Sequence, residues 1–298
     1  MDCIKRHEKW LKRNTKSLKG RTVAITGSTG GIGKELCTYF AHLGANLVLV
    51  DRNRAKSETL RDRLLDRFPE AQIECVTADL EKMESVRKAT DILLGMEIDI
   101  FIHNAGAYEI ERRICDTGYD NVFEINFVSP YYMIRRLLPS LKSRGGKIIA
   151  VGSIAHNYSH IDKNSVDYKD RRRASLVYGN AKRHLMFSLY KLFETNPEML
   201  SIVHPGITFT GITAHYPPLL YAIIKHPMKL IFMKPHKAAL SILSGVFSEC
   251  GYLEWIGPRI FNVWGMPKKK SLRTAGEKEI RIIAERAEEI YRKIEDGV

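Results

Sequence analysis

Short runs rich in β-branched and aliphatic residues recur along the chain, and segments long enough for a helix separate them. Alternating strands and helices are typical of a parallel sheet with helices on both faces. Strands buried on both faces read as continuous apolar runs, as LVLV and IFI do here. The predicted strands are residues 21–26, 46–51, 72–77, 98–103, 146–153 and 200–205. The pattern therefore predicts an α/β fold, doubly wound around a parallel sheet of six to seven strands.

The size and composition of the chain suit a single domain built on this sheet. The chain has 298 residues, of which 44% are hydrophobic and 27% are charged. These proportions are ordinary for a globular protein that buries a sizeable core. The sequence shows no internal repeat of solenoid length and no low-complexity linker. We therefore expect one main domain over residues 21–270.

Both ends of the chain look like additions to this domain. Residues 1–20 are interpreted as a basic N-terminal extension, with Ile4, Leu11 and Leu18 on one stripe of a weakly amphipathic helix. Residues 271–298 are interpreted as a C-terminal helix that docks on the body, because isoleucines recur there at helical spacing with acidic and basic residues between them.

The formal net charge of +13 raises the question of a nucleic-acid partner. Nearly half of this excess lies in residues 1–21, which hold eight basic and two acidic side chains. No sequence signature of a nucleic-acid-binding module accompanies the basic residues. We interpret the charge as a solvated basic surface and expect no nucleic acid, with attraction to an anionic membrane surface as the alternative.

The cysteines and the N-terminal residues bear on the cellular compartment in which the protein is expected. The five cysteines are scattered and lack CxxC spacing, which argues for a reducing environment rather than a disulfide framework or a zinc site. The first 14 residues carry charges throughout and contain no apolar segment of the kind found in signal peptides. We therefore expect a cytoplasmic protein, with peripheral contact to a membrane surface as the alternative.

A glycine-rich segment, TGSTGGIG, follows the first predicted strand and precedes a helical pattern. Gly27, Gly31 and Gly33 allow a tight turn and a close approach of the backbone to a pyrophosphate. The N-terminus of the next helix offers N–H groups and the positive end of its dipole to that anion. This strand, turn and helix predict a Rossmann fold that binds a dinucleotide, although the spacing reads TGxxxGxG rather than GxGxxG.

Two residues at the end of the second predicted strand bear on the choice of dinucleotide. Asp51 lies 18 residues after Gly33, and an acidic side chain near that spacing accepts hydrogen bonds from ribose hydroxyls. The same carboxylate would repel a 2′-phosphate, which favours NAD. Arg52 could instead receive such a phosphate. We expect NAD, with NADP as the alternative.

A phenol and an ammonium group lie one helical turn apart in SLVYGNAKRH, as Tyr178 and Lys182. An isolated phenol has a pKa of about 10. A lysine on the same helix face should stabilise the phenolate and bring its pKa towards the working pH, so that the phenol can exchange a proton with a substrate. A chance pair on a surface helix is the alternative.

Over roughly residues 20–265 the chain resembles the short-chain dehydrogenase/reductase family. The resemblance rests on seven pieces that occur in the family's order. These pieces are TGSTGGIG, ADL with Asp79, HNAG with Asn104, Ala105 and Gly106, EIN with Asn126, VGSIA with Ser153, YGNAK with Tyr178 and Lys182, and HPGITFT with Pro205, Gly206 and Thr210.

Within this family the chain is similar to the branch of retinol dehydrogenases and steroid or carbonyl reductases. The similarity lies in SIAH after the fifth predicted strand, in the 25-residue gap from Ser153 to Tyr178, and in VHPGITFTGI. The segment NFVSPYY departs from this branch, because Pro130 follows Asn126 closely and no glycine does.

The resemblance implies hydride exchange between a nicotinamide and an alcohol or carbonyl. It implies that Tyr178 is the general acid and base, and that Lys182 also binds the nicotinamide ribose. Ser153 is then expected to hold the substrate oxygen. Asn126 is expected to fix, through its main chain, a water that leads protons away through Lys182.

The resemblance also implies the cofactor contacts, position by position. Tyr178 and Lys182 belong to them, and the remaining residues run along the cofactor from the pyrophosphate turn to the nicotinamide. These residues are Gly27, Ser28, Gly31, Ile32, Gly33, Asp51, Arg52, Asp79, Leu80, Asn104, Ala105, Gly106, Pro205, Gly206, Thr208 and Thr210. No metal is expected, because His103, His156 and His204 lie at separate strand ends without ligand spacing.

Residues 211–235 follow these motifs and are rich in Leu, Ile, Tyr, Phe and Met. An apolar loop at this place suits a lid over a hydrophobic substrate such as a steroid, a retinoid or another lipid. A buried core or dimer surface is the first alternative. Contact with a membrane through Lys225, Lys229 and Lys234, together with the basic extension, is the second.

The sequence therefore predicts an NAD(P)-dependent oxidoreductase for a hydrophobic alcohol, ketone or aldehyde. The resemblance also implies a homodimer or higher homo-oligomer that forms through the helices bearing Asn126 and Tyr178. A non-catalytic dinucleotide-binding regulator on the same fold is the alternative function.

Overall fold

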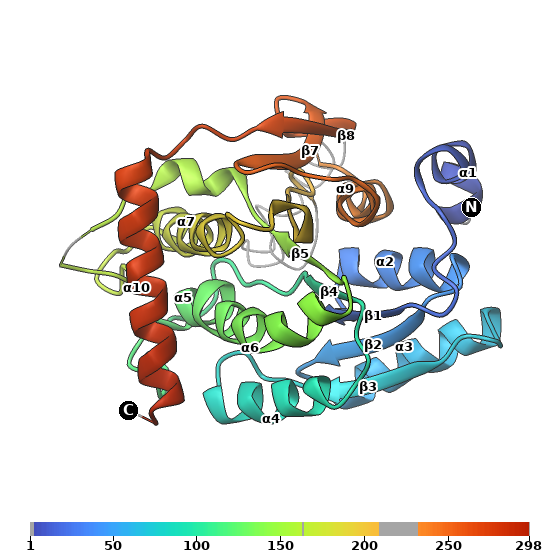
Figure 1. Ribbon diagram of the computed structural model, residues 1–298, viewed down its shortest axis with the longest axis horizontal. Helices are drawn as coiled ribbons and strands as arrows, with labels where there is room; N and C mark the ends of the chain where they lie inside the picture. Colours follow the sequence, from blue (N-terminus) through green and yellow to red (C-terminus); the bar gives the residue numbers. More distant parts are fainter. Residues whose placement is uncertain (1–2, 163, 209–231, 298) are drawn as a thin grey trace, which may run out of the picture.

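The computed structural model describes residues 3–162, 164–208 and 232–297, and within them an eight-stranded sheet forms the centre of the molecule (Figure 1). The strand order is β3-β2-β1-β4-β5-β6-β7-β8. Strands β1 to β7 pair in parallel, and β8 pairs antiparallel with β7. The strands are β1 (Thr22–Thr26), β2 (Asn46–Asp51), β3 (Ile73–Thr77), β4 (Ile100–His103), β5 (Lys147–Val151), β6 (Leu200–Val203), β7 (Glu254–Ile260) and β8 (Trp264–Ser271).

The doubly wound α/β fold predicted from the sequence is confirmed, and the sheet is one strand wider than the upper expectation. The six predicted runs form β1 to β6. The additional pair, β7 and β8, forms a hairpin at one edge of the sheet. Strand β8 reads WGMPKKKS and lacks alternating apolar residues. Lysines and a proline are typical of an exposed edge strand, because they discourage pairing with another chain.

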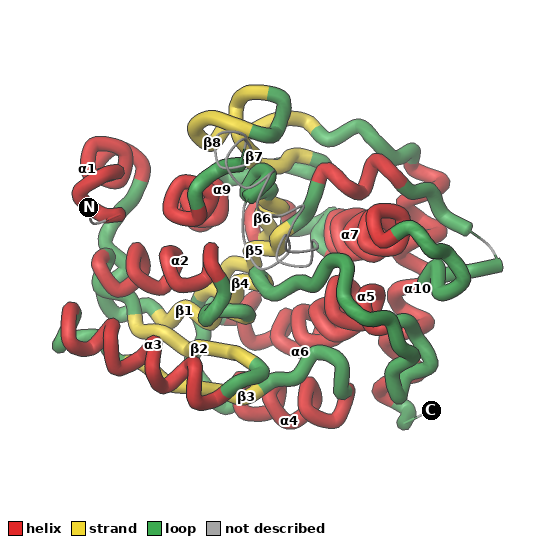
Figure 2. Tube along the Cα trace, turned by 180° about the vertical axis from the view of Figure 1, so that it is seen from behind, coloured by secondary structure: helices red, strands yellow, loops and turns green. Residues whose placement is uncertain are grey.

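Helices cover both faces of the sheet, and each face has its own hydrophobic core (Figures 1 and 2). Alternate strand residues supply the two cores: Val23 and Ile25 of β1 point to one and Ala24 to the other. One face carries α1 (Cys3–Asn14), α2 (Gly31–His42), α3 (Arg54–Arg67) and α9 (Pro235–Phe247). The other face carries α4 (Met83–Leu94), α6 (Ser129–Ser143), α7 (Ala174–Leu192) and α10 (Glu277–Glu295).

Short helical segments complete the fold between the larger elements. A three-residue turn, α5 (Asn121–Phe123), continues into a π-helical turn, η1 (Glu124–Val128), which runs directly into α6. Pro130 lies in the first turn of α6, directly after the π-helical turn, and its missing N–H removes one donor from this continuous helical run. The 3₁₀ turns are η2 (Ile154–Tyr158) after β5 and η3 (Pro197–Met199) before β6.

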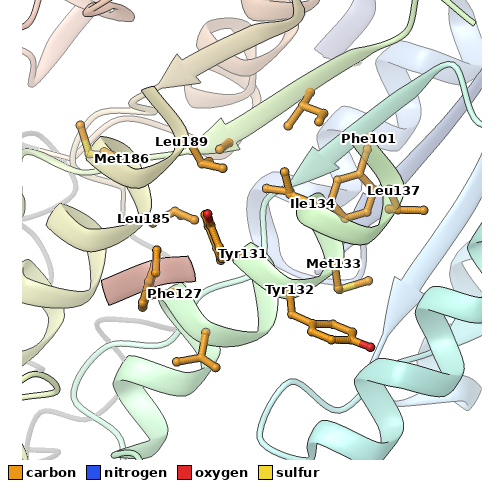
Figure 3. Close-up of a cluster of buried hydrophobic side chains, with 14 of the residues drawn as sticks. Phe101, Phe127, Tyr131, Tyr132, Met133, Ile134, Leu137, Leu185, Met186 and Leu189 are labelled. Carbon is orange, nitrogen blue, oxygen red and sulfur yellow. The ribbon is translucent and has the colours of Figure 1, made fainter. Parts of the chain in front are cut away.

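Helices α6 and α7 are anchored by the larger core, part of which is shown in Figure 3. Tyr131 and Leu137 of α6 and Leu185 and Leu189 of α7 are buried there. Burial of one such side chain contributes about 1.5–3 kcal/mol. This packing fixes α7, which carries Tyr178 and Lys182, and α6, which continues the turn η1 that carries Asn126.

The two ends of the chain pack on opposite faces. Ile4 and Leu11 of α1 are buried against the α2 and α9 side, and Leu18 is buried beyond the helix end. The apolar stripe of α10 is buried against the α6 and α7 side. Of the predicted loop, residues 211–231 lie outside the described residues. Within the described part, no helix is both long and apolar enough to cross a bilayer.

Candidate active site

The glycine turn after β1 brings backbone together so closely that side chains are excluded. Gly27 has a φ of +69°, and a Cβ added there would lie 2.9 Å from the Cα atom of Ala105. A Cβ on Gly33 would lie 2.2 Å from the carbonyl oxygen of Gly27. Gly30 forms the N-cap of α2 without a side-chain cap, so the first N–H groups of this helix face the turn. The turn is thus a cradle for an anionic group.

A pocket of about 470 Å³ lies beside this turn, at the carboxyl ends of the strands. Its volume lies in the usual range for small-molecule and cofactor sites. Glycines in the cradle and N–H groups at the start of α2 suit the pyrophosphate of a dinucleotide. Among the predicted residues, the pocket is lined by Gly27, Gly31, Ile32, Gly33, Asp51, Arg52, Asp79, Leu80, Asn104, Ala105 and Gly106.

Asn104 holds two of these strands in register. Its side-chain amide donates to the carbonyl oxygens of Thr26, at 3.1 Å, and Gly27, at 3.0 Å. Its backbone N–H donates to the hydroxyl of Thr26, at 3.1 Å. Asn104 therefore ties the end of β4 to the end of β1 and to the glycine turn.

Ser28, another predicted contact, is fully buried and faces Asp51 instead of the pocket. Asp51 accepts hydrogen bonds from the hydroxyl of Ser28, from that of Ser57 at 3.0 Å, and from the N–H and hydroxyl of Thr29 at 3.0 and 2.9 Å. A carboxylate has about four acceptor sites. Asp51 is therefore largely committed to holding the glycine turn and the start of α3.

Basic side chains meet the pocket next to Asp51. Arg52 is 68% exposed, and its guanidinium lies 3.5 Å from the carboxylate of Glu81. Asn53 and Lys56, which were not among the predicted contacts, also line the pocket. The signal that could have found them is the run DRNRAK, which places three basic residues directly after a strand end that meets a dinucleotide turn.

Asn126 lies fully buried in the π-helical turn η1 and supports the backbone at the end of β4. Its amide nitrogen donates to the carbonyl oxygens of Ala107, at 2.7 Å, and Val122, at 2.8 Å. Its side-chain oxygen accepts from the N–H of Ala107, at 3.3 Å. A Cβ on Gly106 would lie 2.9 Å from that oxygen, so glycine allows this contact.

Lys182 lies on α7 with 1% exposure, and its ammonium nitrogen is 5.7 Å from the ring centre of Tyr178. The nitrogen donates to the carbonyl oxygen of Val151 at the end of β5, at 2.9 Å. Burial lowers the pKa of Lys182 to about 7, because the interior disfavours its charged form. The proton of Lys182 is therefore exchangeable near neutral pH.

Tyr178 differs from the expectation in the direction of its pKa. Burial raises the pKa of the Tyr178 phenol to about 12, and the hydrogen bond with Ser153 only partly offsets this rise. From the sequence we expect Lys182 to lower this pKa. That expectation is wrong for this arrangement, because the lysine is itself buried and donates to the carbonyl of Val151.

Ser153 lies beside the phenol as the N-cap of η2. Its hydroxyl oxygen accepts from the N–H of Ala155, at 3.1 Å, which leaves the hydroxyl proton to be donated elsewhere. Tyr108, which lines the pocket, packs edge-on against Tyr178 with ring centres 5.3 Å apart. Ser153, Tyr178 and Lys182 thus meet at the ends of β5 and α7, next to the pocket wall.

A buried network behind Ser153 was not predicted. His156 lies at its centre, with one ring nitrogen 2.5 Å from the carbonyl oxygen of Ser153 and the other 2.8 Å from the hydroxyl of Thr274. Arg183 donates to the carbonyl oxygens of His156 and Thr274 and makes two hydrogen bonds of 2.7 Å to Glu279 of α10. No sequence signal indicates this pair, because Arg183 and Glu279 are 96 positions apart.

The last predicted contacts follow β6. Pro205, Gly206 and Thr208 do not line the pocket, and Thr210 lies outside the described residues. Gly206 has a φ of +85°, and a Cβ there would lie 2.8 Å from the carbonyl oxygen of Val263 in the turn between β7 and β8. In the described part of the chain, no group of three His, Cys, Asp or Glu side chains is arranged to hold a metal ion.

Comparison with known proteins agrees with this fold. The family model for short chain dehydrogenases matches residues 21–165. Short-chain dehydrogenase TIC 32 A, chloroplastic, of Brassica napus is 29% identical over 210 residues, which cover 65% of this chain and 66% of that protein. Human retinol dehydrogenase 13 is 26% identical over 203 residues, which cover 66% of this chain and 61% of that protein.

Solved structures show the same architecture. The crystal structure of an uncharacterized protein from Mycobacterium paratuberculosis has a TM-score of 0.72 at 22% identity, with 94% of this chain and 96% of that one covered. A short-chain dehydrogenase from Sphingobium yanoikuyae in complex with NADPH has a TM-score of 0.50 at 26% identity, with 65% and 74% covered.

The structure combines a Rossmann-type domain, a glycine cradle, and a serine, a tyrosine and a lysine next to the pocket. This combination is typical of a class of dinucleotide-binding proteins. The chain matches the short-chain dehydrogenase/reductase family over residues 21–165, and the relatives to which it is similar include retinol dehydrogenases. It spans about two thirds or less of the length of the curated relatives described above.

Proposed function

We propose that the protein is an NAD(P)-dependent oxidoreductase that interconverts a hydrophobic alcohol and the corresponding ketone or aldehyde. The observation that carries the proposal is the meeting of Ser153, Tyr178 and Lys182 beside a pocket whose glycine cradle suits a dinucleotide. When bound, the nicotinamide would accept the hydride from the alcohol carbon, or return it to the carbonyl carbon.

Tyr178 is the acid and base in this proposal. In oxidation its oxygen takes the hydroxyl proton of the alcohol, while in reduction its phenol returns a proton to the carbonyl oxygen. A phenol with a pKa of about 12 remains protonated at neutral pH, which suits it as the acid in reduction. Ser153 has a hydroxyl proton to donate and holds the substrate oxygen against the phenol.

Lys182 transfers protons between the Tyr178 phenol and solvent in this proposal. Its pKa of about 7 allows it to gain and release a proton at working pH. In the proposal it binds the nicotinamide ribose and passes protons between Tyr178 and a water held near Asn126. Asn126 contributes by fixing the backbone around Gly106 and Ala107, which lie between the pocket and the lysine.

For the cofactor we place NADP above NAD, which reverses the preference expected from the sequence. Asp51 is occupied by four donors within the protein and is 5% exposed. Arg52 and Lys56 line the same end of the pocket and suit the 2′-phosphate of the adenosine ribose. The related Sphingobium yanoikuyae enzyme is recorded with NADPH.

The substrate class remains as proposed from the sequence: a steroid, retinoid or lipid-like alcohol or carbonyl. Tyr108, Ile110 and Ile125 give the pocket an apolar side, and a relative carries the name retinol dehydrogenase. For the compartment we propose the cytoplasm, because the five cysteines, all within the described ranges, form no disulfide.

The test is a spectrophotometric screen at 340 nm with NADH and NADPH and a panel of steroid, retinoid and aliphatic carbonyls. Tyr178→Phe should lower the rate by at least about a hundredfold, which is typical for loss of a general acid. Tyr190→Phe is the matched control, because this phenol lies on the same helix and donates to the carbonyl of Glu254 away from the pocket. Turnover that survives Tyr178→Phe would contradict the proposal.

A further inference from the structure

Exposed apolar side chains gather at the tip of the β7–β8 hairpin. Among the described residues, seven large hydrophobic side chains are exposed, and four of them lie within seven positions. They are Ile260 at 49%, Phe261 at 85%, Trp264 at 38% and Met266 at 36%. We call residues 259–268 the hairpin tip. Isolated exposed apolar residues need no explanation, but such a cluster marks an interaction site.

The turn itself makes the choice of Phe261 unusual. The N–H of Val263 donates to the carbonyl oxygen of Ile260, at 2.9 Å, and closes a tight turn. Its two central residues, Phe261 and Asn262, have φ angles of +50° and +59°. Such turns favour asparagine and glycine, and a bulky residue at positive φ is rare. Phe261 is thus held in a costly conformation and gains no core packing in return.

The charge around the tip is positive only. Residues 255–276 contain five basic residues and no acidic one. Lys269 pairs with Glu254 at the base of the hairpin, and Lys270 donates to the carbonyl of Pro258, so both serve the hairpin. Arg259 and Lys268 are exposed on either side of the apolar tip. Protection of an edge strand explains lysines on β8, but it does not explain an aromatic tip.

The position of the hairpin adds to this surface. Strand β7 runs parallel to β6, so the tip lies at the carboxyl edge of the sheet, the same edge that carries the pocket at the ends of β1 to β4. Helix α9 contacts both the hairpin and α1, and Figures 1 and 2 show α1 and the hairpin at the same end of the molecule. Lys5, Arg6 and Lys9 are exposed on α1. A basic helix thus lies near the apolar tip.

We propose that the hairpin tip docks the protein on an anionic lipid membrane. Phe261 and its apolar neighbours would enter the boundary between headgroups and acyl chains, while Arg259 and Lys268 contact the headgroups. A lipid surface fits better than a protein partner, because the tip is a convex turn of four side chains and a stable protein interface needs about 800 Å² on each partner. The docking does not depend on the proposed reaction.

One consequence does rest on the proposed function. A tip embedded at the carboxyl edge of the sheet would bring the rim of the site to the membrane surface. A hydrophobic substrate could then pass from the bilayer to the pocket without crossing water. In that case vesicles that carry the substrate should lower its apparent KM in the wild type, but not in Phe261→Ser.

The test is co-sedimentation of the full chain with phosphatidylcholine vesicles, with and without added phosphatidylserine, an anionic lipid of the cytoplasmic leaflet. Wild type should bind the anionic vesicles and be released by salt. Phe261→Ser should weaken binding by roughly tenfold, because the partition of one aromatic side chain is lost. Ile92→Ser is the matched control, because Ile92 is 50% exposed on α4, on the face of the sheet opposite to α1 and α9.

Several outcomes would overturn the proposal. One is equal binding by wild type and Phe261→Ser, and another is equal binding to neutral and anionic vesicles. A third is loss of binding in Lys5→Gln/Lys9→Gln while Phe261→Ser binds like the wild type, which would assign the contact to α1 and not to the hairpin tip. Self-association that Phe261→Ser abolishes, without vesicle binding, would assign the tip to a second copy. Thermal unfolding of each variant would show that its fold is retained.

Discussion

At the scale of single residues, burial controls the chemistry of the site more than sequence neighbours do. Tyr178 and Lys182 lie one helical turn apart, as the sequence predicts, but burial moves their pKa values in opposite directions, to about 12 and about 7. Both shifts favour the neutral form. The pair therefore stores one proton on the phenol and exchanges another at the lysine near neutral pH.

The low pKa of Lys182 predicts a pH dependence of stability. In the unfolded chain a lysine titrates near 10.5, so between pH 7 and 10.5 the unfolded state binds more protons than the folded one. The contribution of Lys182 to stability should therefore rise across this window, by on the order of several kcal/mol at most. Lys182→Met should remove this rise, and urea unfolding at pH 6, 8 and 10 measures it. If the free energies of unfolding of the wild type and Lys182→Met change in parallel with pH, the lowered pKa of Lys182 would be contradicted.

Residues at the adenosine end predict the cofactor preference. Arg52→Ala and Lys56→Ala should each weaken NADPH binding roughly tenfold and leave NADH binding nearly unchanged, because only NADPH carries the 2′-phosphate. Arg54→Ala is the matched control, since Arg54 pairs with Glu58 on the surface of α3 and does not line the pocket. Calorimetric titration with both dinucleotides decides the matter. Equal losses for NADH and NADPH would refute a phosphate site.

At the scale of elements, α10 reaches the site through the buried network around His156. The Arg183 side chain is 1% exposed, and four hydrogen bonds to η2, the segment before α10 and Glu279 satisfy its guanidinium. Removal of one partner from such a pair leaves a buried charge without compensation. The C-terminal helix therefore helps to fix the segment that begins at Ser153.

This network predicts a cost for a small change on α10. Glu279→Gln should lower the free energy of unfolding by about 3 kcal/mol, measured by urea denaturation. Glu285→Gln on the same helix is the control and should stay within about 0.5 kcal/mol, because the Arg281–Glu285 pair is exposed on both sides. Similar decreases in the free energy of unfolding of the two variants would show that the buried pair stabilises the fold no more than the exposed pair does.

At the scale of the whole molecule, α10 covers the helical face through which the resemblance implies dimerisation. Its apolar stripe is buried against α6 and α7, and Glu288 accepts hydrogen bonds from Tyr131, at 2.6 Å, and Arg135, at 3.1 Å. Arg136 pairs with Glu295 near the end of the helix, at 3.1 Å. The chain thus packs its own helix where a partner would lie.

We therefore expect a monomer, which differs from the homo-oligomer expected from the resemblance. Sedimentation equilibrium at micromolar concentration should give the chain mass of 34.1 kDa. A dimer that forms through α6 and α7 would have to displace α10 and expose its buried isoleucines. A particle of twice the chain mass would show that another surface associates or that α10 moves.

Local signals in the sequence determined the parallel core of the fold and the kind of site. The runs that became β1 to β6, the glycines of the dinucleotide turn and the spacing of Tyr178 and Lys182 each act over a few residues, so the order of the chain reveals them. The hairpin of β7 and β8 gave a weaker signal, because an edge strand lacks the apolar pattern of a buried one.

Only the tertiary structure decided the burial and the hydrogen-bond partners of side chains that contact distant segments of the chain. It placed Glu279 against Arg183, engaged Asp51 with four donors, buried Lys182 against the carbonyl of Val151, and left Phe261 exposed at the tip of the β7–β8 hairpin. Charge, hydrogen bonding and burial at these positions are set by residues far away in the chain. Sequence spacing can name the groups that perform chemistry, but the solvent and partners around each group come from the fold.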